Sequence, residues 1–176
     1  QAGDEFGAAL ATGDFDADQF VDLAVGVPVG MGNGVEAAGH VVVLYGSAAG
    51  ITGVGSQEWE QDDTAGACEI YDNFGASLAS GDYDGDGDCD LAVGVPYEDV
   101  GSWFVKTDAG AVNLIYGSPN GLSSAGSRFL YQGGFGMSET LERDDLFGMA
   151  LSVGDFNGDG WADLAVGAPG ESVETA

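Results

Sequence analysis

The chain has 176 residues and a formal net charge of −27 at pH 7, from 30 acidic and 3 basic side chains. Nucleic acid and anionic membrane surfaces need clustered Lys and Arg, and no apolar stretch reaches the ~18 residues of a membrane-spanning helix, so we expect no nucleic-acid partner and no membrane insertion. Hydrophobic residues make up 44% of the chain, which excludes a disordered acidic tail.

One sequence pattern occurs three times along the chain. It opens with a Phe-Gly pair, at Phe6, Phe74 and Phe147, and the pairs are 68 and then 73 residues apart. An Asp-rich loop follows each pair, and an apolar run ending in Gly-Val-Pro or Gly-Ala-Pro follows each loop. Repetition at such a period indicates stacked modules. We therefore predict a first unit at 1–67, a second at 68–140 and a partial third at 141–176.

Short apolar runs predict the strands of each unit. The run after the Asp-rich loop is typical of a buried strand that ends at a proline, because proline cannot donate to a sheet ladder. Two further runs follow in each complete unit, at 40–47 and 57–61 and again at 111–118 and 128–132. With the Phe-Gly segment, each unit holds about four strands, the content of one propeller blade. The predicted fold is all-β, with β-propeller blades of four antiparallel strands, few helices and about two and a half repeats.

The Asp-rich loops are the strongest chemical signal in the chain. Carboxylates packed this closely repel one another unless a cation neutralises them, and oxygen-only ligands select a hard ion, with Ca²⁺ first. Positions 1, 3, 5 and 9 are predicted to supply side-chain oxygens: Asp14, Asp16, Asp18 and Asp22 in loop one, Asp82, Asp84, Asp86 and Asp90 in loop two, and Asp155, Asn157, Asp159 and Asp163 in loop three. Position 7 would add a backbone carbonyl, from Phe20, Asp88 and Trp161. We therefore expect about three bound Ca²⁺ ions.

Loop one departs from the other two loops at position 6. The tight turn there favours glycine, which Gly87 and Gly160 supply, whereas loop one has Gln19. A non-glycine residue at positive φ costs about 1–2 kcal/mol, so we expect loop one to be the weakest site or to adopt a different turn. The EF-hand is excluded, because its loop needs a Glu at position 12 and valine stands there in all three loops.

The combined pattern resembles the FG-GAP repeat, which forms the seven-bladed propeller of integrin alpha subunits and also occurs in bacterial secreted and surface proteins. The resemblance implies one Ca²⁺ per Asp-rich loop and an extracellular or cell-surface location. Seven blades of about 70 residues would need nearly three times this sequence. We therefore expect the chain to be part of a larger propeller, which would place other blades of the same protein beside it. A homo-oligomer that completes the ring is the alternative.

The two cysteines suggest a cross-link. Cys68 lies six residues before Phe74, and Cys89 is position 8 of loop two. We predict a disulfide between them, which would close a ring of ~20 residues and stabilise the fold by roughly 3 kcal/mol. Such a bond would fit export from the cell. Two free thiols in a cytosolic protein are the alternative.

Catalytic signals are weak, whereas one connection differs between the repeats. His40 is the only histidine, no Gly-x-Ser-x-Gly motif is present, and we expect His40 to be a plain surface residue and the chain not to be an enzyme. The connection 97–108 is three residues longer than its counterpart in the first repeat and contains Tyr97, Trp103 and the only lysine, Lys106. Since recognition concentrates on variable loops, we predict that this connection and the loop 30–38 contact a protein or glycan partner.

The function most consistent with these features is a calcium-binding extracellular scaffold for binding or adhesion. A carbohydrate-binding, lectin-like propeller is one alternative. The propeller portion of a larger secreted hydrolase or lyase is the other.

Overall fold

The computed structural model describes residues 3–101, 104–134, 137 and 140–172. These residues form two four-stranded sheets and one two-stranded sheet, all antiparallel. Sheet 1 contains β1 (Leu10–Gly13), β2 (Asp22–Val27), β3 (His40–Leu44) and β4 (Gln57–Trp59). Sheet 2 contains β5 (Ser77–Gly81), β6 (Asp90–Val95), β7 (Ala111–Tyr116) and β8 (Ser123–Leu130), and sheet 3 contains β9 (Ala150–Gly154) and β10 (Asp163–Gly167). The predicted all-β fold with four-stranded antiparallel blades is confirmed.

Helical structure is nearly absent from the described residues. Their single helix is the short 3-10 helix η1 (Gln61–Asp63), which follows β4 directly. Nowhere in the described ranges is there a helix of the length and hydropathy needed to cross a membrane. The outer strand β8 begins at Ser123, ahead of the apolar run at 128–132 from which it was predicted.

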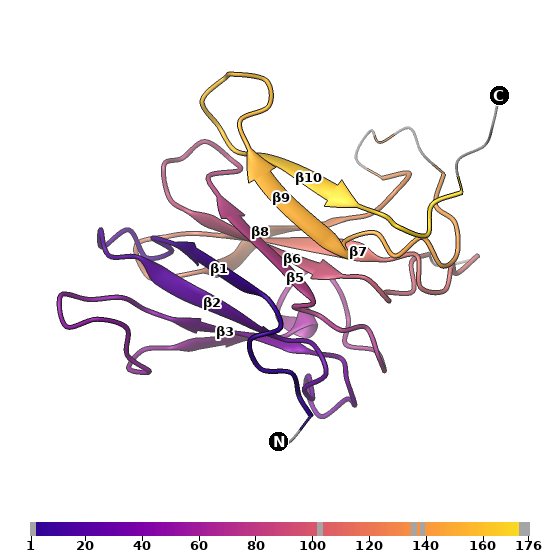
Figure 1. The fold of residues 1–176 in the computed structure, drawn as a ribbon, viewed down its shortest axis with the longest axis horizontal. Coiled ribbons are helices and arrows are strands. Elements are labelled where there is room, and N and C mark those ends of the chain that lie inside the picture. Colours follow the sequence, from indigo (N-terminus) through magenta and orange to yellow (C-terminus); the bar gives the residue numbers. More distant parts are fainter. Residues whose placement is uncertain (1–2, 102–103, 135–136, 138–139, 173–176) are drawn as a thin grey trace.

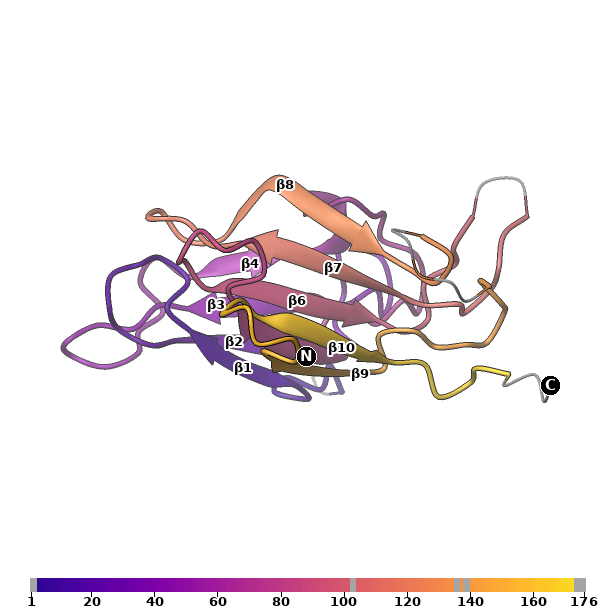
Figure 2. The ribbon, with the colours of Figure 1, turned by 90° about the horizontal axis from the view of Figure 1, so that it is seen from above.

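The three sheets lie side by side, as successive blades do in a propeller (Figure 1). Their first strands face one another, with β5 in contact with both β1 and β9. Figure 2 shows β1 and β9 along one edge of the molecule and the outer strand β8 along the opposite edge. Strand order within each sheet follows chain order, so each sheet is a simple meander. The unit boundaries at 67/68 and 140/141 stay predictions.

Equivalent strands differ in burial although their sequences agree. The strands β2, β6 and β10 all contain Asp-Leu-Ala-Val-Gly. Every residue of β6 is buried, whereas those of β10 are half-buried or exposed. One apolar cluster fills the space between sheets 1 and 2, and another fills the space between sheets 2 and 3. Sheet 2 is therefore covered on both faces, and the neighbouring sheets determine how far an apolar run is buried.

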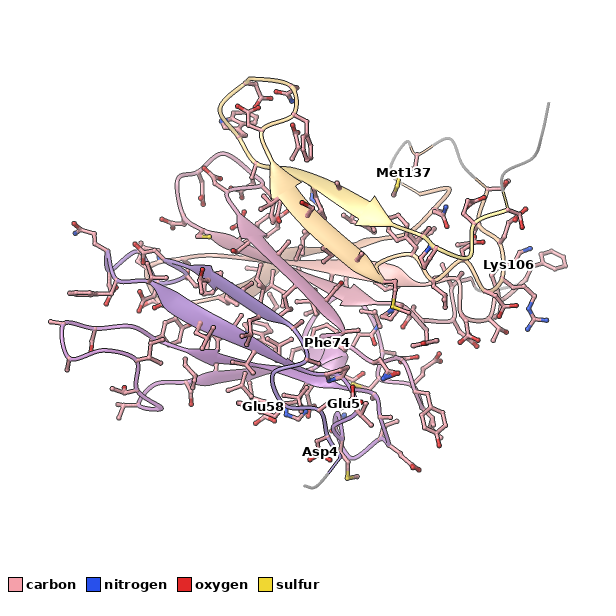
Figure 3. All side chains as sticks on the ribbon, viewed as in Figure 1. Asp4, Glu5, Glu58, Phe74, Lys106 and Met137 are labelled. Carbon is pink, nitrogen blue, oxygen red and sulfur yellow. The ribbon has the colours of Figure 1, made fainter. Side chains whose placement is uncertain are left out.

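The Phe-Gly pairs of sheets 2 and 3 join each of these sheets to the preceding one, whereas Phe6 of sheet 1 is exposed. Phe74, labelled in Figure 3, is fully buried and donates its N–H to the carbonyl of Ala38 at 2.7 Å. Phe147 has the same role at the next junction. The glycine of the Gly-Val-Pro motif completes this contact, because a Cβ on Gly26 would lie 2.1 Å from the carbonyl oxygen of Gly75. Both motifs of the repeat are thus needed for the close approach of adjacent sheets.

Candidate metal centres

The three Asp-rich loops share one turn. Each loop joins the first strand of a sheet to the second and folds around its position-1 aspartate. In loop one, Asp14 Oδ2 accepts a hydrogen bond from the N–H of Gln19 at 2.9 Å. The other loops make the same bond at 3.0 Å, from Gly87 to Asp82 Oδ2 and from Gly160 to Asp155 Oδ2. This hydrogen bond from position 6 to position 1, which we call the loop frame, is present in loop one even though its position 6 is not glycine.

Two positions of the turn require the left-handed backbone conformation. In loop one these are Ala17 and Gln19, with φ of 57° and 75°. Loops two and three have glycine at both positions, namely Gly85, Gly87, Gly158 and Gly160. The expected alternative of a different turn in loop one is therefore wrong: the loop keeps the turn and carries two non-glycine residues at a cost of about 1–2 kcal/mol each. Position 4 was missed in the sequence, although the glycines of the other two loops marked it.

The position-9 aspartates are the most buried acids of the loops. Asp90 is fully buried, and its Oδ2 accepts from the N–H of Tyr83 at 2.8 Å while its Oδ1 accepts from Gly117 at 2.9 Å. Asp22 makes the same pair of bonds, to Phe15 and Gly46, each at 2.7 Å. Burial raises the pKa of Asp90 to about 6. The position-9 carboxylate thus connects the Asp-rich loop to the end of the third strand by hydrogen bonds. The sequence predicted only a ligand role for it.

Carboxylate oxygens converge in loops one and two. In loop one, one oxygen from each of Asp14, Asp16 and Asp22 (positions 1, 3 and 9) lies within 4.8 Å of the others. In loop two the converging acids are instead at positions 1, 3 and 5, namely Asp82, Asp84 and Asp86. Burial and the charge of Asp22 both raise the pKa of Asp16. Such a set of hard oxygen atoms fits Ca²⁺. Because like charges at this separation repel one another, a divalent cation would relieve their repulsion.

In loops one and two, the aspartates at positions 3 and 5 each accept a hydrogen bond at one carboxylate oxygen from a backbone N–H two residues later. The second oxygen of each carboxylate does not take part in this bond. Asp86 Oδ1 accepts from the N–H of Asp88 at 2.9 Å, as Asp18 Oδ1 does from Phe20 at 2.8 Å. Asp84 Oδ1 accepts from the N–H of Asp86 at 3.2 Å. The side chains are therefore oriented before any cation arrives.

Loop three has a neutral side chain at position 3. Asn157 donates its Nδ2 to Asp159 Oδ2 at 2.9 Å, and its Oδ1 accepts from the N–H of Asp159 at 2.8 Å. Asp163 accepts at Oδ2 from the N–H of Phe156 at 2.8 Å, as the equivalent acids do in the other loops. Loop three therefore has one acid fewer than loop one at positions 1, 3, 5 and 9, and its Asn157 amide donates to a neighbouring carboxylate.

Position 7 carries an aromatic side chain in loops one and three. Phe20 and Trp161 are both exposed, whereas Asp88 of loop two is half-buried. A Cβ on Gly85 would lie 2.5 Å from Cε2 of Trp161. The indole of loop three thus packs directly on loop two, which gives Gly85 a second reason to be glycine besides its positive φ.

The predicted disulfide is absent, and both cysteines are free thiols. They lie at opposite ends of the strands. Cys89 sits beside the start of loop one, where a Cβ on Gly13 would be 2.4 Å from its Sγ. Cys68 lies at the other end, where its N–H donates to Asp62 Oδ1 at 2.9 Å. Burial raises the pKa of Cys89 to about 11, so this thiol is also poorly reactive.

His40 lies beside a carboxylate on the side of sheet 1. Its Nε2 lies 3.6 Å from Glu58 Oε1 across the β3–β4 pair, and its side chain is only 16% exposed. The expectation of a plain surface residue is therefore wrong in detail, because the ring packs against Gly30, where a Cβ would lie 2.6 Å from Cε1. The histidine is a packed residue on the side of a sheet.

The predicted recognition connection lies at the end of sheet 2 opposite the Asp-rich loops. Val100 and Lys106 exchange two backbone hydrogen bonds, at 3.1 and 2.8 Å. Phe104 at the tip is 88% exposed and Tyr97 is also exposed. Figure 3 shows Lys106 at the outer margin of the molecule. Trp103 lies outside the described residues.

Comparisons with known proteins identify the repeat. A family model for the FG-GAP repeat matches residues 6–44, 74–112 and 147–176. The chain is 36% identical over 171 residues to integrin alpha-PS2 of Drosophila melanogaster, which is 96% of this chain and 11% of that protein. It is 33% identical over 172 residues to integrin alpha-5 of Xenopus laevis, with 94% of this chain and 15% of that protein covered.

A relative of another kind is similarly close. Phosphatidylinositol-glycan-specific phospholipase D of Bos taurus is 32% identical over 170 residues, which are 93% of this chain and 18% of that protein. The chain thus spans less than a fifth of the length of each of these three relatives. The repeat matches cover more than half of its residues, and the chain belongs to the FG-GAP repeat family.

Proposed function

We propose that this chain is a calcium-binding propeller segment that acts as an extracellular or cell-surface scaffold for binding or adhesion. The observation that carries the proposal is the common frame of the three Asp-rich loops, which recurs at the same end of each sheet. The likeness to integrin alpha chains over almost the whole chain supports the same function.

The charge of the chain favours calcium binding outside the cell. Three Ca²⁺ ions would change the formal charge from −27 to −21 and would neutralise the densest acidic groups. Sites built from aspartate and carbonyl oxygens in extracellular modules bind calcium in the range of about 10⁻⁴–10⁻³ M. Millimolar extracellular calcium would then keep the loops occupied and the sheets in register.

Partner recognition is assigned to the end opposite the metal loops. The loops there differ between repeats and expose apolar side chains, among them Phe104 and Met31. Tyr97 and Lys106 lie in the same connection as Phe104, and Trp103 is proposed as its energetic anchor, since aromatic residues often dominate binding energy. The partner would be a protein or a glycan.

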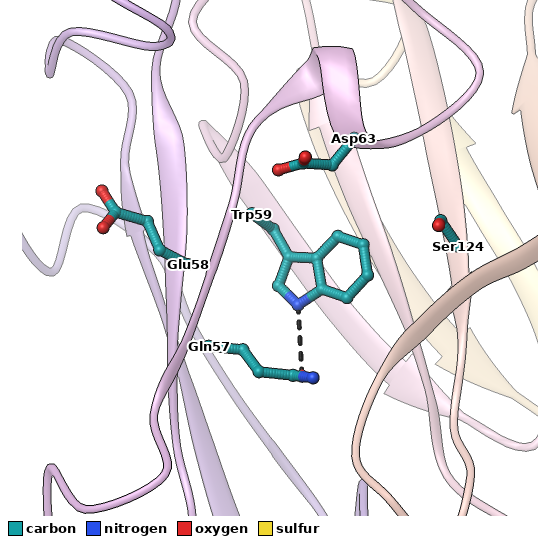
Figure 4. A pocket seen from close by; sticks show the side chains of 5 residues that line it. All are labelled: Gln57, Glu58, Trp59, Asp63 and Ser124. Atoms are coloured by element: carbon teal, nitrogen blue, oxygen red, sulfur yellow. Dashed lines mark hydrogen bonds between the residues drawn. The ribbon is translucent and has the colours of Figure 1, made fainter.

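A lectin-like function has less support. The hollow in Figure 4 is lined by Gln57, Glu58, Trp59, Asp63 and Ser124 and has a volume of about 270 Å³. Its polar side chains would suit sugar hydroxyl groups. However, Trp59 is only 8% exposed and donates its Nε1 to Gln57 Oε1 at 3.3 Å. The indole therefore serves the core and offers little face on which a sugar ring could stack.

A place within a larger secreted hydrolase is the second candidate function. The 32% identity to a phosphatidylinositol-glycan-specific phospholipase D favours it. In that case the chain would supply a calcium-stabilised scaffold. Its histidine, His40, lies beside Glu58 and packs against Gly30, with no nucleophile paired to it among the described residues.

Isothermal titration of the chelated chain with CaCl₂ tests the proposal. The wild type should bind three ions in the Asp-rich loops, and Asp86→Ala should lose one of them. Glu36→Gln is the matched control, since it changes an exposed acid at the opposite end. Equal calcium uptake by Asp86→Ala and the control would overturn the assignment of loop two.

A further inference from the structure

A second group of acids converges away from the Asp-rich loops. Glu142, Asp145 and Glu171 each place one carboxylate oxygen within 4.8 Å of the others. The first two lie in the linker before β9, and Glu171 lies just after β10. Since loop three joins β9 to β10 at the other end, this junction cluster sits at the opposite end of the strands (Figure 1).

One acid of the junction cluster is buried with an oxygen that has no hydrogen-bond partner. Asp145 is 1% exposed, and its Oδ2 accepts from the N–H of Glu142 at 2.8 Å. Its Oδ1 is buried and unpartnered. Leaving a buried polar atom unsatisfied is costly, more so when it is charged. Burial and the charge of Glu171 raise the pKa of Asp145, and the charge of Lys106 opposes them only in part.

A second, neutral side chain borders the same group. Gln132 is 6% exposed and donates its Nε2 to Glu171 Oε2 at 2.5 Å. Its Oε1 is buried without a hydrogen-bond partner. An amide oxygen is a regular ligand of Ca²⁺. Gln132 Oε1 and Asp145 Oδ1 thus both lack hydrogen-bond partners at the place where the three carboxylates meet.

Lys106 acts on Asp145 only through its charge, and the ion pairs of the described residues lie elsewhere. Among the described residues, the ion pairs are His40 with Glu58 and Arg143 with Asp144, at 3.6 Å each. Neither pair includes a member of the junction cluster. The ligand set contains only oxygen, which favours a hard divalent cation over zinc or copper.

The same residue pattern stands at the preceding junction. Gln61, Glu69, Asp72 and Glu98 lie 71 to 73 residues before Gln132, Glu142, Asp145 and Glu171. Gln61 donates its Nε2 to Glu98 Oε2 at 2.6 Å, and its Oε1 is likewise buried and unpartnered. Burial there raises the pKa of Asp72 to about 7 and of Glu98 to about 8, which favours the protonated form of both acids. At the later junction, Glu142 and Glu171 are half-buried and the three carboxylates converge.

We infer that the junction cluster is a further calcium site, formed by Glu142, Asp145 and Glu171 with the Gln132 amide oxygen as an added ligand. The site lies between sheets 2 and 3, because Gln132 follows β8 of sheet 2, whereas the linker before β9 and the segment after β10 belong to sheet 3. A cation at this place fastens the two sheets at the end that the Asp-rich loops do not reach. The site does not depend on the function proposed for those loops.

Native mass spectrometry of the chain with Ca²⁺ alone tests this site. Asp145→Asn and Glu171→Gln should each bind one ion fewer than the wild type. Asp86→Ala should also lose one ion, and the double variant Asp86→Ala/Glu171→Gln should lose two. Glu36→Gln should lose none. Glu171→Gln keeps the inference testable if Asp145→Asn fails to fold, because Glu171 is only half-buried.

Unchanged calcium counts in the folded Glu171→Gln variant would overturn the inference and would show that protons satisfy the cluster. This outcome would not affect the calcium sites proposed for the Asp-rich loops. Those sites would be contradicted instead by an unchanged calcium count in Asp86→Ala. Circular dichroism of each variant confirms that the compared chains are folded.

Discussion

The carbonyl oxygen of Asp82 accepts a hydrogen bond from the N–H of Ala162 at 2.9 Å, which connects loop two to loop three. Asp14 and Cys89 make the equivalent bond between loop one and loop two at 3.3 Å. In each case position 1 of one metal loop is bound to position 8 of the next. The Asp-rich loops therefore form a connected series, and a cation bound in one loop would also steady its neighbour.

This connection predicts coupling between calcium sites. Asp159→Ala removes a ligand from loop three and should also weaken calcium binding in loop two by about 2- to 5-fold, the effect of one hydrogen bond of about 0.5–1 kcal/mol. Calcium titrations of Asp159→Ala, Asp86→Ala and the double variant form a cycle that isolates the coupling. Strictly additive effects of the two substitutions would mean that the loops bind independently.

The strained turn of loop one predicts a stabilising substitution. Gln19→Gly removes a non-glycine residue at φ 75° and should raise the free energy of unfolding by about 0.5–1 kcal/mol, since the greater freedom of glycine in the unfolded chain offsets part of the strain relief. Calcium affinity of loop one should rise with it. Urea unfolding at saturating calcium measures the change, with Gln57→Gly in a strand as a destabilising control. A loss of stability on Gln19→Gly would show that the turn is relaxed.

The packing of Trp161 on loop two predicts a difference between two glycines. Gly85→Ala and Gly87→Ala both place a Cβ at positive φ, but only the first meets Trp161, whereas a Cβ on Gly87 meets nothing within 4 Å. Gly85→Ala should therefore be more destabilising, by about 1–3 kcal/mol of overpacking. Adding Trp161→Ala should recover most of that difference. Equal melting temperatures for the two single variants would show that the Trp161 indole does not restrict position 85.

The buried acids between sheets 1 and 2 predict a pH dependence. The pKa of Glu98 is raised to about 8 and that of Asp72 to about 7, both chiefly by burial. A raised pKa in the folded state contributes stability below the unfolded pKa of about 4, and this contribution is lost as pH rises through the folded values. In EDTA, the free energy of unfolding should fall between about pH 5 and 8.

The substitution Glu98→Gln separates this contribution from that of other groups. It should reduce the slope throughout about pH 5 to 8 and nearly abolish it between about pH 7 and 8, where Asp72 no longer contributes, whereas Glu36→Gln should keep the full slope. Urea unfolding at pH 5, 6.5 and 8 provides the comparison. If the two variants show the same pH profile, Glu98 keeps its ordinary titration in the folded chain.

Much of the fold could be predicted because the same sequence pattern occurs three times along the chain. Phe74 and the Gly-Val-Pro motif are local signals with one structural meaning, namely the close approach of adjacent sheets. The loop turn was also predictable, and the glycines at positions 4 and 6 of loops two and three specify it. Loop one follows the same turn because its neighbours and its aspartates impose it against the preference of Ala17 and Gln19.

The remaining features depend on which end of a sheet a residue occupies. The disulfide prediction was wrong because ring size says nothing about that placement, and Cys68 and Cys89 lie at opposite ends. The junction cluster was missed for a similar reason. Its signal, Glu-x-x-Asp-x-Phe-Gly with a later Pro-x-Glu, joins residues about 25 apart, and only the antiparallel return of β10 brings Glu171 back to Asp145.

Calorimetric unfolding of the chain in calcium and in EDTA tests most directly whether Ca²⁺ in the Asp-rich loops holds the sheets together. Each site filled at 100 times its dissociation constant adds about 2.7 kcal/mol, which for a chain of this size corresponds to roughly 5–10 °C in melting temperature. The melting temperature should rise by at least that amount on adding calcium, and the rise should be smaller in Asp86→Ala than in Glu36→Gln. Identical melting temperatures with and without calcium would contradict a stabilising role of Ca²⁺ in the Asp-rich loops.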